Sequence, residues 1–99
     1  MSGTYQSFRI EWQGTGIEIR WAAQWSTSAV YPIAHLELIS DGRVPLPMTE
    51  TGYRSHFIAR EDVESMGGPV AYATAWLDHE AQSETWKRQA EASKQLSLF

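Results

Sequence analysis

The side chains that most often carry out chemistry are few in this chain of 99 residues, and they are scattered along it. The three histidines, His35, His56 and His79, stand far apart and share no neighbour at a metal-ligand spacing. Ser55 beside His56, and Ser65, lack a third residue that would complete a nucleophilic triad. We therefore expect no metal site, no cofactor and no enzyme activity.

The densest cluster of polar and aromatic residues covers residues 51–57. In a strand, alternation would place Arg54 and His56 on the face opposite Tyr53 and Phe57. This segment is where we would look first for a second functional site, and the alternative interpretation is a plain strand of a sheet.

The last five residues join an amide to three large apolar side chains, in the order Gln95, Leu96, Ser97, Leu98 and Phe99. This pentamer resembles the peptide with which bacterial proteins dock on the replicative sliding clamp, the β subunit of DNA polymerase III. The family pattern is Gln, Leu, Ser or Asp, Leu, Phe, and every position matches. With average residue usage, such a pentamer arises by chance in about one chain of this length in several thousand. The resemblance covers the pentamer alone.

The resemblance implies a role for each residue of this peptide. Leu98 and Phe99 would fill the main hydrophobic pocket of the clamp, and Leu96 a shallower one. Gln95 would form a hydrogen bond at the pocket edge, and Ser97 would be a tolerant spacer. The terminal carboxylate of Phe99 would have to reach water or a cation, because burying its charge costs affinity. A segment without structure of its own suits such a groove, at the cost of ordering it.

The function that follows is that of a non-enzymatic accessory protein of DNA replication or repair, from a bacterium, plasmid or phage. Docked on the clamp, it would act as an adaptor for a second partner or as an inhibitor that occupies the cleft. The alternative is a homo-oligomeric structural or regulatory protein whose tail packs on its own domain or on a neighbouring subunit. The two hypotheses differ in whether Leu98 and Phe99 are exposed or buried in the unbound protein.

Composition limits the partners and the compartment. The formal net charge of −4 argues against sequence-independent DNA binding, so we expect no direct contact with nucleic acid. No apolar run approaches membrane-spanning length and no signal peptide is evident, so no membrane contact is expected. The absence of cysteine fits a reducing cytoplasm. The five tryptophans can supply much of the core of one small domain.

Alternating apolar and polar residues predict an antiparallel sheet of four or five short strands. A hairpin turns at residues 13–16, and Glu11 opposite Arg20 is the register favoured by charge. Two prolines make residues 44–48 an edge strand or an extended arm. The other strands are expected over residues 5–12, 17–25, 33–40 and 53–58.

Two helices are expected to complete an α+β domain over residues 1–93, followed by the clamp-binding tail over residues 94–99. A short helix covers residues 61–66. A long helix begins at Pro69, where the missing N–H of proline is harmless, and runs to about Ser93 because no later glycine or proline interrupts it.

The long helix carries two stripes at helical spacing. One is apolar and should pack on the sheet: Val70, Ala73, Leu77 and Ala81. The nearly opposite stripe is aromatic: Tyr72, Trp76, His79 and Trp86. Either loops cover the aromatic stripe, or it forms the interface of a homodimer or with another partner, because contiguous exposed aromatics usually mark an interface.

Overall fold

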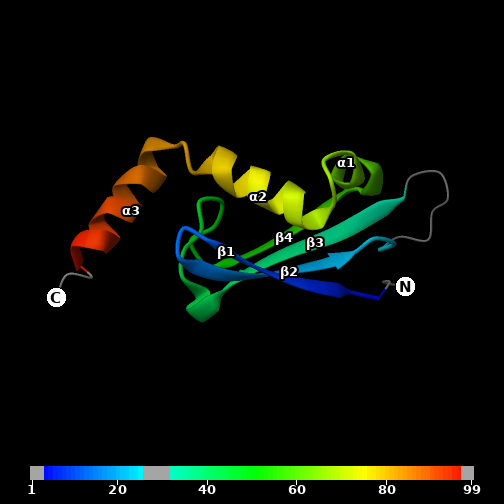
Figure 1. The fold of residues 1–99 in the computed structure, drawn as a ribbon, viewed down its shortest axis with the longest axis horizontal. Helices are drawn as coiled ribbons and strands as arrows, with labels where there is room; N and C mark the ends of the chain where they lie inside the picture. The colour runs from blue at the N-terminus through cyan, green and yellow to red at the C-terminus, as the bar shows by residue number, and fades with distance from the viewer. Residues whose placement is uncertain (1–3, 26–31, 97–99) are drawn as a thin grey trace.

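In the part of the chain that the structure describes, one antiparallel sheet is joined by three helices, which lie on one of its faces or extend beyond it (Figure 1). A computed structural model describes residues 4–25 and 32–96, with side chains up to Ala92. The four strands follow one another in chain order: β1 Gln6–Trp12, β2 Thr15–Ala22, β3 Ile33–Ser40 and β4 Tyr53–Ala59. A short 3-10 turn, η1 Asp41–Arg43, precedes the helices α1 Arg60–Ser65, α2 Pro69–Glu80 and α3 Glu84–Leu96. The expected α+β class is confirmed.

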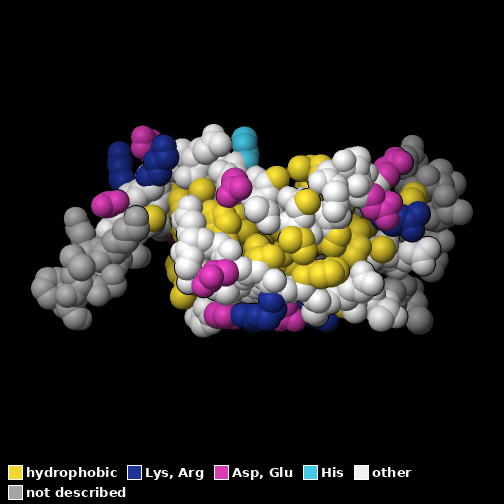
Figure 2. All heavy atoms as spheres, viewed as in Figure 1, with side chains coloured by type: hydrophobic (Ala, Val, Ile, Leu, Met, Phe, Trp, Pro, Cys, Tyr) yellow, Lys and Arg dark blue, Asp and Glu magenta, His cyan; other side chains and the backbone are white. Residues whose placement is uncertain are grey.

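The core lies between the sheet and α2, where apolar residues of alternating strand positions meet the apolar stripe of the helix. Ile19 and Leu36 of the central strands and Leu77 of α2 are fully buried. Figure 2 shows hydrophobic side chains along the middle of the molecule, where partly buried apolar residues of both layers pack against this core. Residues 44–48 form no strand of the sheet, and their only ladder contact within the described chain is an isolated bridge between Leu46 and Thr49.

The β1–β2 hairpin has a tighter turn than the sequence suggested. Only Gln13 and Gly14 lie in the turn, and both have positive φ angles, 48° and 80°. Such a two-residue turn matches the twist of the flanking strands and fixes their pairing. The residue opposite Arg20 is therefore Ser7, and the expected pairing of Glu11 with Arg20 is wrong.

The single long helix expected from Pro69 to Ser93 is also wrong, because the chain breaks it between α2 and α3. The hydroxyl of Ser83 accepts a hydrogen bond from the backbone N–H of Trp86 at 3.1 Å, which caps the start of α3. Glu84 then places negative charge in the first turn, where the helix dipole favours it. The serine cap thus starts a second helix at this point, although no glycine or proline interrupts the sequence.

The corner between the two helices rests on Trp12 at the end of β1. Its indole Nε1 donates to Asp78 Oδ1 of α2 at 2.9 Å, and its ring lies 5.8 Å from the ring of Trp86 in α3. Trp12 is 6% exposed, so one core side chain holds both helices. Beyond this contact α3 leads away from the sheet (Figure 1).

Replacing Ser83 by alanine should destabilise the protein by about 1 kcal/mol, because the backbone N–H of Trp86 at the start of α3 loses its side-chain acceptor. In a domain of this size the melting temperature should fall by about 4–8 °C. Thermal unfolding followed by circular dichroism measures the change. Thr85→Ala, an exposed change in the same turn, is the matched control. An S83A protein as stable as the T85A protein would show that the cap does not maintain the break.

Candidate functional site

The clamp-like pentamer lies at and beyond the end of α3. This helix continues to Leu96, three residues past the expected end at Ser93. The backbone of two pentamer residues is therefore in its last turn, while their side chains and the three final residues lie outside the described part of the chain. The residues concerned are Gln95 and Leu96, then Ser97, Leu98 and Phe99.

Between the domain and the pentamer, α3 makes little contact with the rest of the protein. Trp86 is half-buried against Trp12, but every residue from Lys87 to Ala92 is exposed except Ala90. Glu84 and Arg88, and likewise Lys87 and Glu91, stand at the i,i+4 spacing that supports a solvated helix. This part of α3 therefore has most of its side chains in solvent and extends beyond the sheet (Figure 1).

The helix break divides the aromatic stripe between two places. Trp76 lies on β4, with its ring 4.9 Å from the ring of His56 and 5.6 Å from the guanidinium carbon of Arg54. The ring of Tyr72 follows at 6.2 Å from that of Trp76, and both residues are half-buried. His79 is exposed. The structure thus joins Tyr72 and Trp76 to the sheet.

Trp86 lies at the other place, beside a shallow hollow at the start of α3. The proline-containing loop after η1 forms one wall and the first turns of α3 form the other. The volume is about 240 Å³. The residues that line it are Leu46, Pro47, Met48, Thr49, Glu50, Ser83, Thr85, Trp86 and Gln89. The loop therefore borders Trp86.

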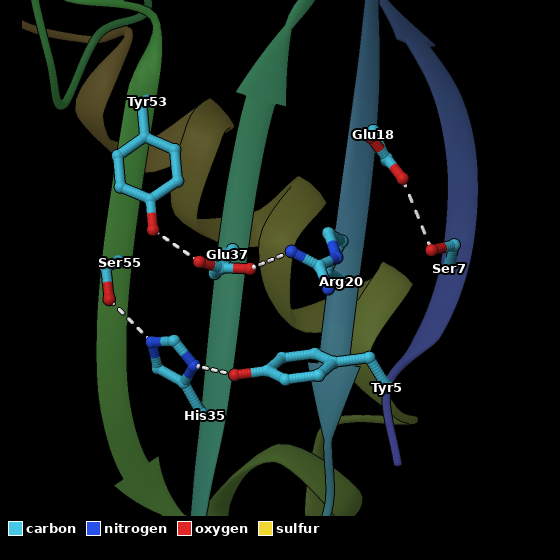
Figure 3. A network of polar contacts seen from close by, with 8 residues as sticks. All are labelled: Tyr5, Ser7, Glu18, Arg20, His35, Glu37, Tyr53 and Ser55. Carbon is cyan, nitrogen blue, oxygen red and sulfur yellow. Dashed lines mark hydrogen bonds and ion pairs between the residues drawn. The ribbon is translucent and has the colours of Figure 1, made fainter. Parts of the chain in front are cut away.

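The face of the sheet opposite the helices carries a polar network centred on Glu37 (Figure 3). Glu37 is only 9% exposed, in the middle of the central strand β3. One of its carboxylate oxygens accepts from Arg20 Nη1 at 2.9 Å, and the other accepts from the hydroxyl of Tyr53. That hydrogen bond, together with burial, raises the pKa of Tyr53. Both oxygens of the carboxylate are thus satisfied.

His35 is the second buried polar residue of this face, and both of its ring nitrogens have partners. Nδ1 lies 2.5 Å from the hydroxyl of Tyr5, and Nε2 lies 2.6 Å from Ser55 Oγ (Figure 3). The ring of Phe57 stacks on the imidazole at 4.4 Å, and the ring of Trp25 lies at 5.0 Å. Burial raises the pKa of Tyr5, and the nearby negative charge of Glu37 raises it further.

β4 shows the alternation that the sequence predicted for residues 53–57. Tyr53 and Phe57 belong to the polar–aromatic face, while Arg54 and His56 turn to the helices. Sequence reasoning missed the partners that the other strands and the residues beside them supply to this face: Tyr5, Arg20, Trp25, His35 and Glu37. The one signal in the sequence was a strand with polar residues at alternate positions. Such residues need hydrogen-bond partners when they are buried, but the partners cannot be named until the register of the strands is known. In the described part of the chain no three acidic or histidine residues come together as metal ligands.

Comparison with known proteins identifies the domain. Residues 5–86 match the family model described as the KlcB third domain. Neither a curated protein nor a solved structure matches the chain. The match ends at Trp86, so it includes the sheet, α1, α2 and the corner, but neither the exposed part of α3 nor the pentamer. Within residues 4–25 and 32–96, no helix has the length and apolarity that crossing a membrane requires.

His56 should make the protein less stable as the pH falls. Burial, and after it the positive charge of Arg54, lowers the pKa of His56 from its ordinary value of 6.5. Near this pH the unfolded chain therefore protonates His56 more readily than the folded protein does. As a result, the free energy of unfolding falls as the pH drops below about 6.5. His56→Gln should weaken this fall. Urea unfolding at a series of pH values, followed by tryptophan fluorescence, measures it.

His79→Gln is the control for this experiment, because it also removes one histidine but changes an exposed side chain of α2. The H79Q protein should keep the dependence of the unmodified protein. An H56Q protein with the same pH dependence as H79Q would contradict the assignment to His56.

Proposed function

We propose that this chain, which belongs to the KlcB third-domain family, is an accessory protein of DNA replication or repair that docks on a bacterial sliding clamp through its last five residues. The observation that carries the proposal is the pentamer from Gln95 to Phe99, which agrees with the clamp-binding pattern at every position. Docking of this kind needs no catalytic step and takes place in the cytoplasm.

The geometry of α3 supports this proposal. Among the described side chains of α3, Trp86 is the last that packs on the core, and the pentamer begins at Gln95, nine residues further along the helix. At a rise of about 1.5 Å per residue, the pentamer begins about 14 Å beyond Trp86. This distance lets a groove on another protein receive the peptide without a clash between the two bodies.

The affinity should come mainly from two side chains. Burying a leucine or phenylalanine contributes about 1.5–3 kcal/mol, so Leu98 and Phe99 together would supply most of the binding energy. Gln95 would add direction through its amide. Ser97, as a spacer, would add little.

Calorimetric titration of the full chain into a purified bacterial β clamp should show saturable binding. Leu98→Ala and Phe99→Ala should each weaken it by about 10- to 100-fold, because each loses most of one side-chain burial. Ser97→Ala is the matched control within the same peptide and should bind as the unmodified chain does.

Two outcomes would contradict the proposal. One is an intact chain that does not bind, which would favour the homo-oligomer with a packed tail, and sedimentation would then show a mass that falls when Leu98 and Phe99 are removed. The other is an S97A protein that loses as much affinity as L98A, because the peptide would then not bind in the expected register.

Adaptor and inhibitor are separated by adding the chain to a primer-extension reaction that depends on the clamp. An inhibitor should slow extension in proportion to clamp occupancy, and L98A should not. An adaptor should instead retain a second protein from a cell extract even when Leu98 and Phe99 have been removed, because that partner binds the domain. A chain that does neither would leave clamp docking without a consequence for either role.

A further inference from the structure

We propose that Ser55 is a reactive serine that accepts an acyl or phosphoryl group from small activated donors, with His35 as its general base. The sequence offered no such pair, because the histidine next to Ser55 in the chain, His56, turns to the opposite face of β4. The proposal rests on the sheet alone and does not depend on clamp docking.

The geometry places a hydroxyl and a base within reach of each other. Ser55 is exposed on β4, and its Oγ lies 2.6 Å from His35 Nε2 of the neighbouring strand. Ser55 pairs with Glu37 and His35 pairs with Phe57, so the two side chains meet diagonally across one step of the ladder. A nucleophile and a base are usually found at this distance in enzymes that form covalent intermediates.

The imidazole is also held in place, as a base must be. His35 is 6% exposed, and the rings of Phe57 and Trp25 pack against it. The proposal assigns the ring proton to Nδ1, which donates to the hydroxyl oxygen of Tyr5 at 2.5 Å. The lone pair of Nε2 then accepts the hydroxyl hydrogen of Ser55.

The surroundings can hold the positive charge that His35 would gain. The face of Phe57, which stacks on the imidazole, attracts a cation, and Tyr5 accepts a hydrogen bond from it. Glu37 belongs to the same network, and its carboxylate also neutralises Arg20 at 2.9 Å. His35 therefore shares this face with the negative charge of Glu37, and the positive charge of Arg20 is already paired with that carboxylate.

The step balances as an ordinary acyl or phosphoryl transfer. Ser55 Oγ forms a bond to the carbonyl carbon or phosphorus of the donor, and the bond to the leaving group breaks. The hydroxyl proton moves to His35 Nε2 and then to the leaving group or to water. Arg20, the cation of the network in Figure 3, donates to Glu37 rather than toward Ser55, so the network supplies no second donor for an oxyanion. We expect one modification per chain and no turnover.

The test is labelling of the intact chain with an alkyl fluorophosphonate, with the modified residue identified by mass spectrometry. Phosphorus binds Oγ and fluoride leaves. Ser7 is the internal control, because it is also exposed on this face and donates to a carboxylate, that of Glu18, at 3.2 Å. Ser55 should be labelled at least about tenfold faster than Ser7, since a positioned base contributes about 10²–10⁴-fold.

Variants assign the base. Ser55→Ala should abolish the fast labelling, Ser7→Ala should leave it unchanged, and His35→Gln should reduce it at least about tenfold. Folding of H35Q is checked by circular dichroism. Equal labelling of Ser55 and Ser7 in the unmodified chain would overturn the proposal, and so would fast labelling of Ser55 in a folded H35Q protein. If H35Q does not fold, the comparison of the two serines in the unmodified chain decides.

Discussion

The structure depends on one buried charge in the middle of its sheet. Glu37 sits in β3 with almost no access to water, and a carboxylate in that position must be satisfied by partners from both sides. Arg20 reaches it from β2 and Tyr53 from β4. A slip of either neighbouring strand by one residue would turn its partner to the other face and leave the charge unpaired. The pairing of three strands is thus fixed by chemistry on one face, while apolar packing fixes it on the other.

The parts of this fold that could be predicted are those that depend on local periodicity. The strand from Ile33 to Ser40 and the alternation of Tyr53 and Phe57 against Arg54 follow from residue types two apart. The hairpin register could not be found that way, because it depends on positive φ angles at the turn. The break before Glu84 also escaped, because a serine cap is a weaker signal than glycine or proline. Contacts such as His35 with Ser55 depend on register, so no local pattern reveals them.

The chain combines two parts with different evidence for what they do. The family match ends at Trp86, the last of the described side chains that packs on the core, and the pentamer follows after an exposed stretch of helix. The family model thus covers the sheet, α1 and α2 without the pentamer, and the pentamer needs no side chain of the domain to match its pattern. A peptide that acts through its own few side chains can be joined to an unrelated fold, so the family gives no information about docking and docking gives none about the family.

The contact of Trp12 with Asp78 and Trp86 limits how far the domain could move relative to a protein that binds the pentamer. A Gly- or Ser-rich linker of the same length would let its ends explore a sphere and dilute one binding site relative to the other. Here the arm is a helix of fixed direction whose base is held by one indole. With the pentamer held in a groove, the domain would stay within a few nanometres of that surface at a nearly constant angle. Its local concentration there would be in the millimolar range that short tethers reach. The rigid corner at Trp12 would thus set the distance between the domain and the surface that binds the pentamer.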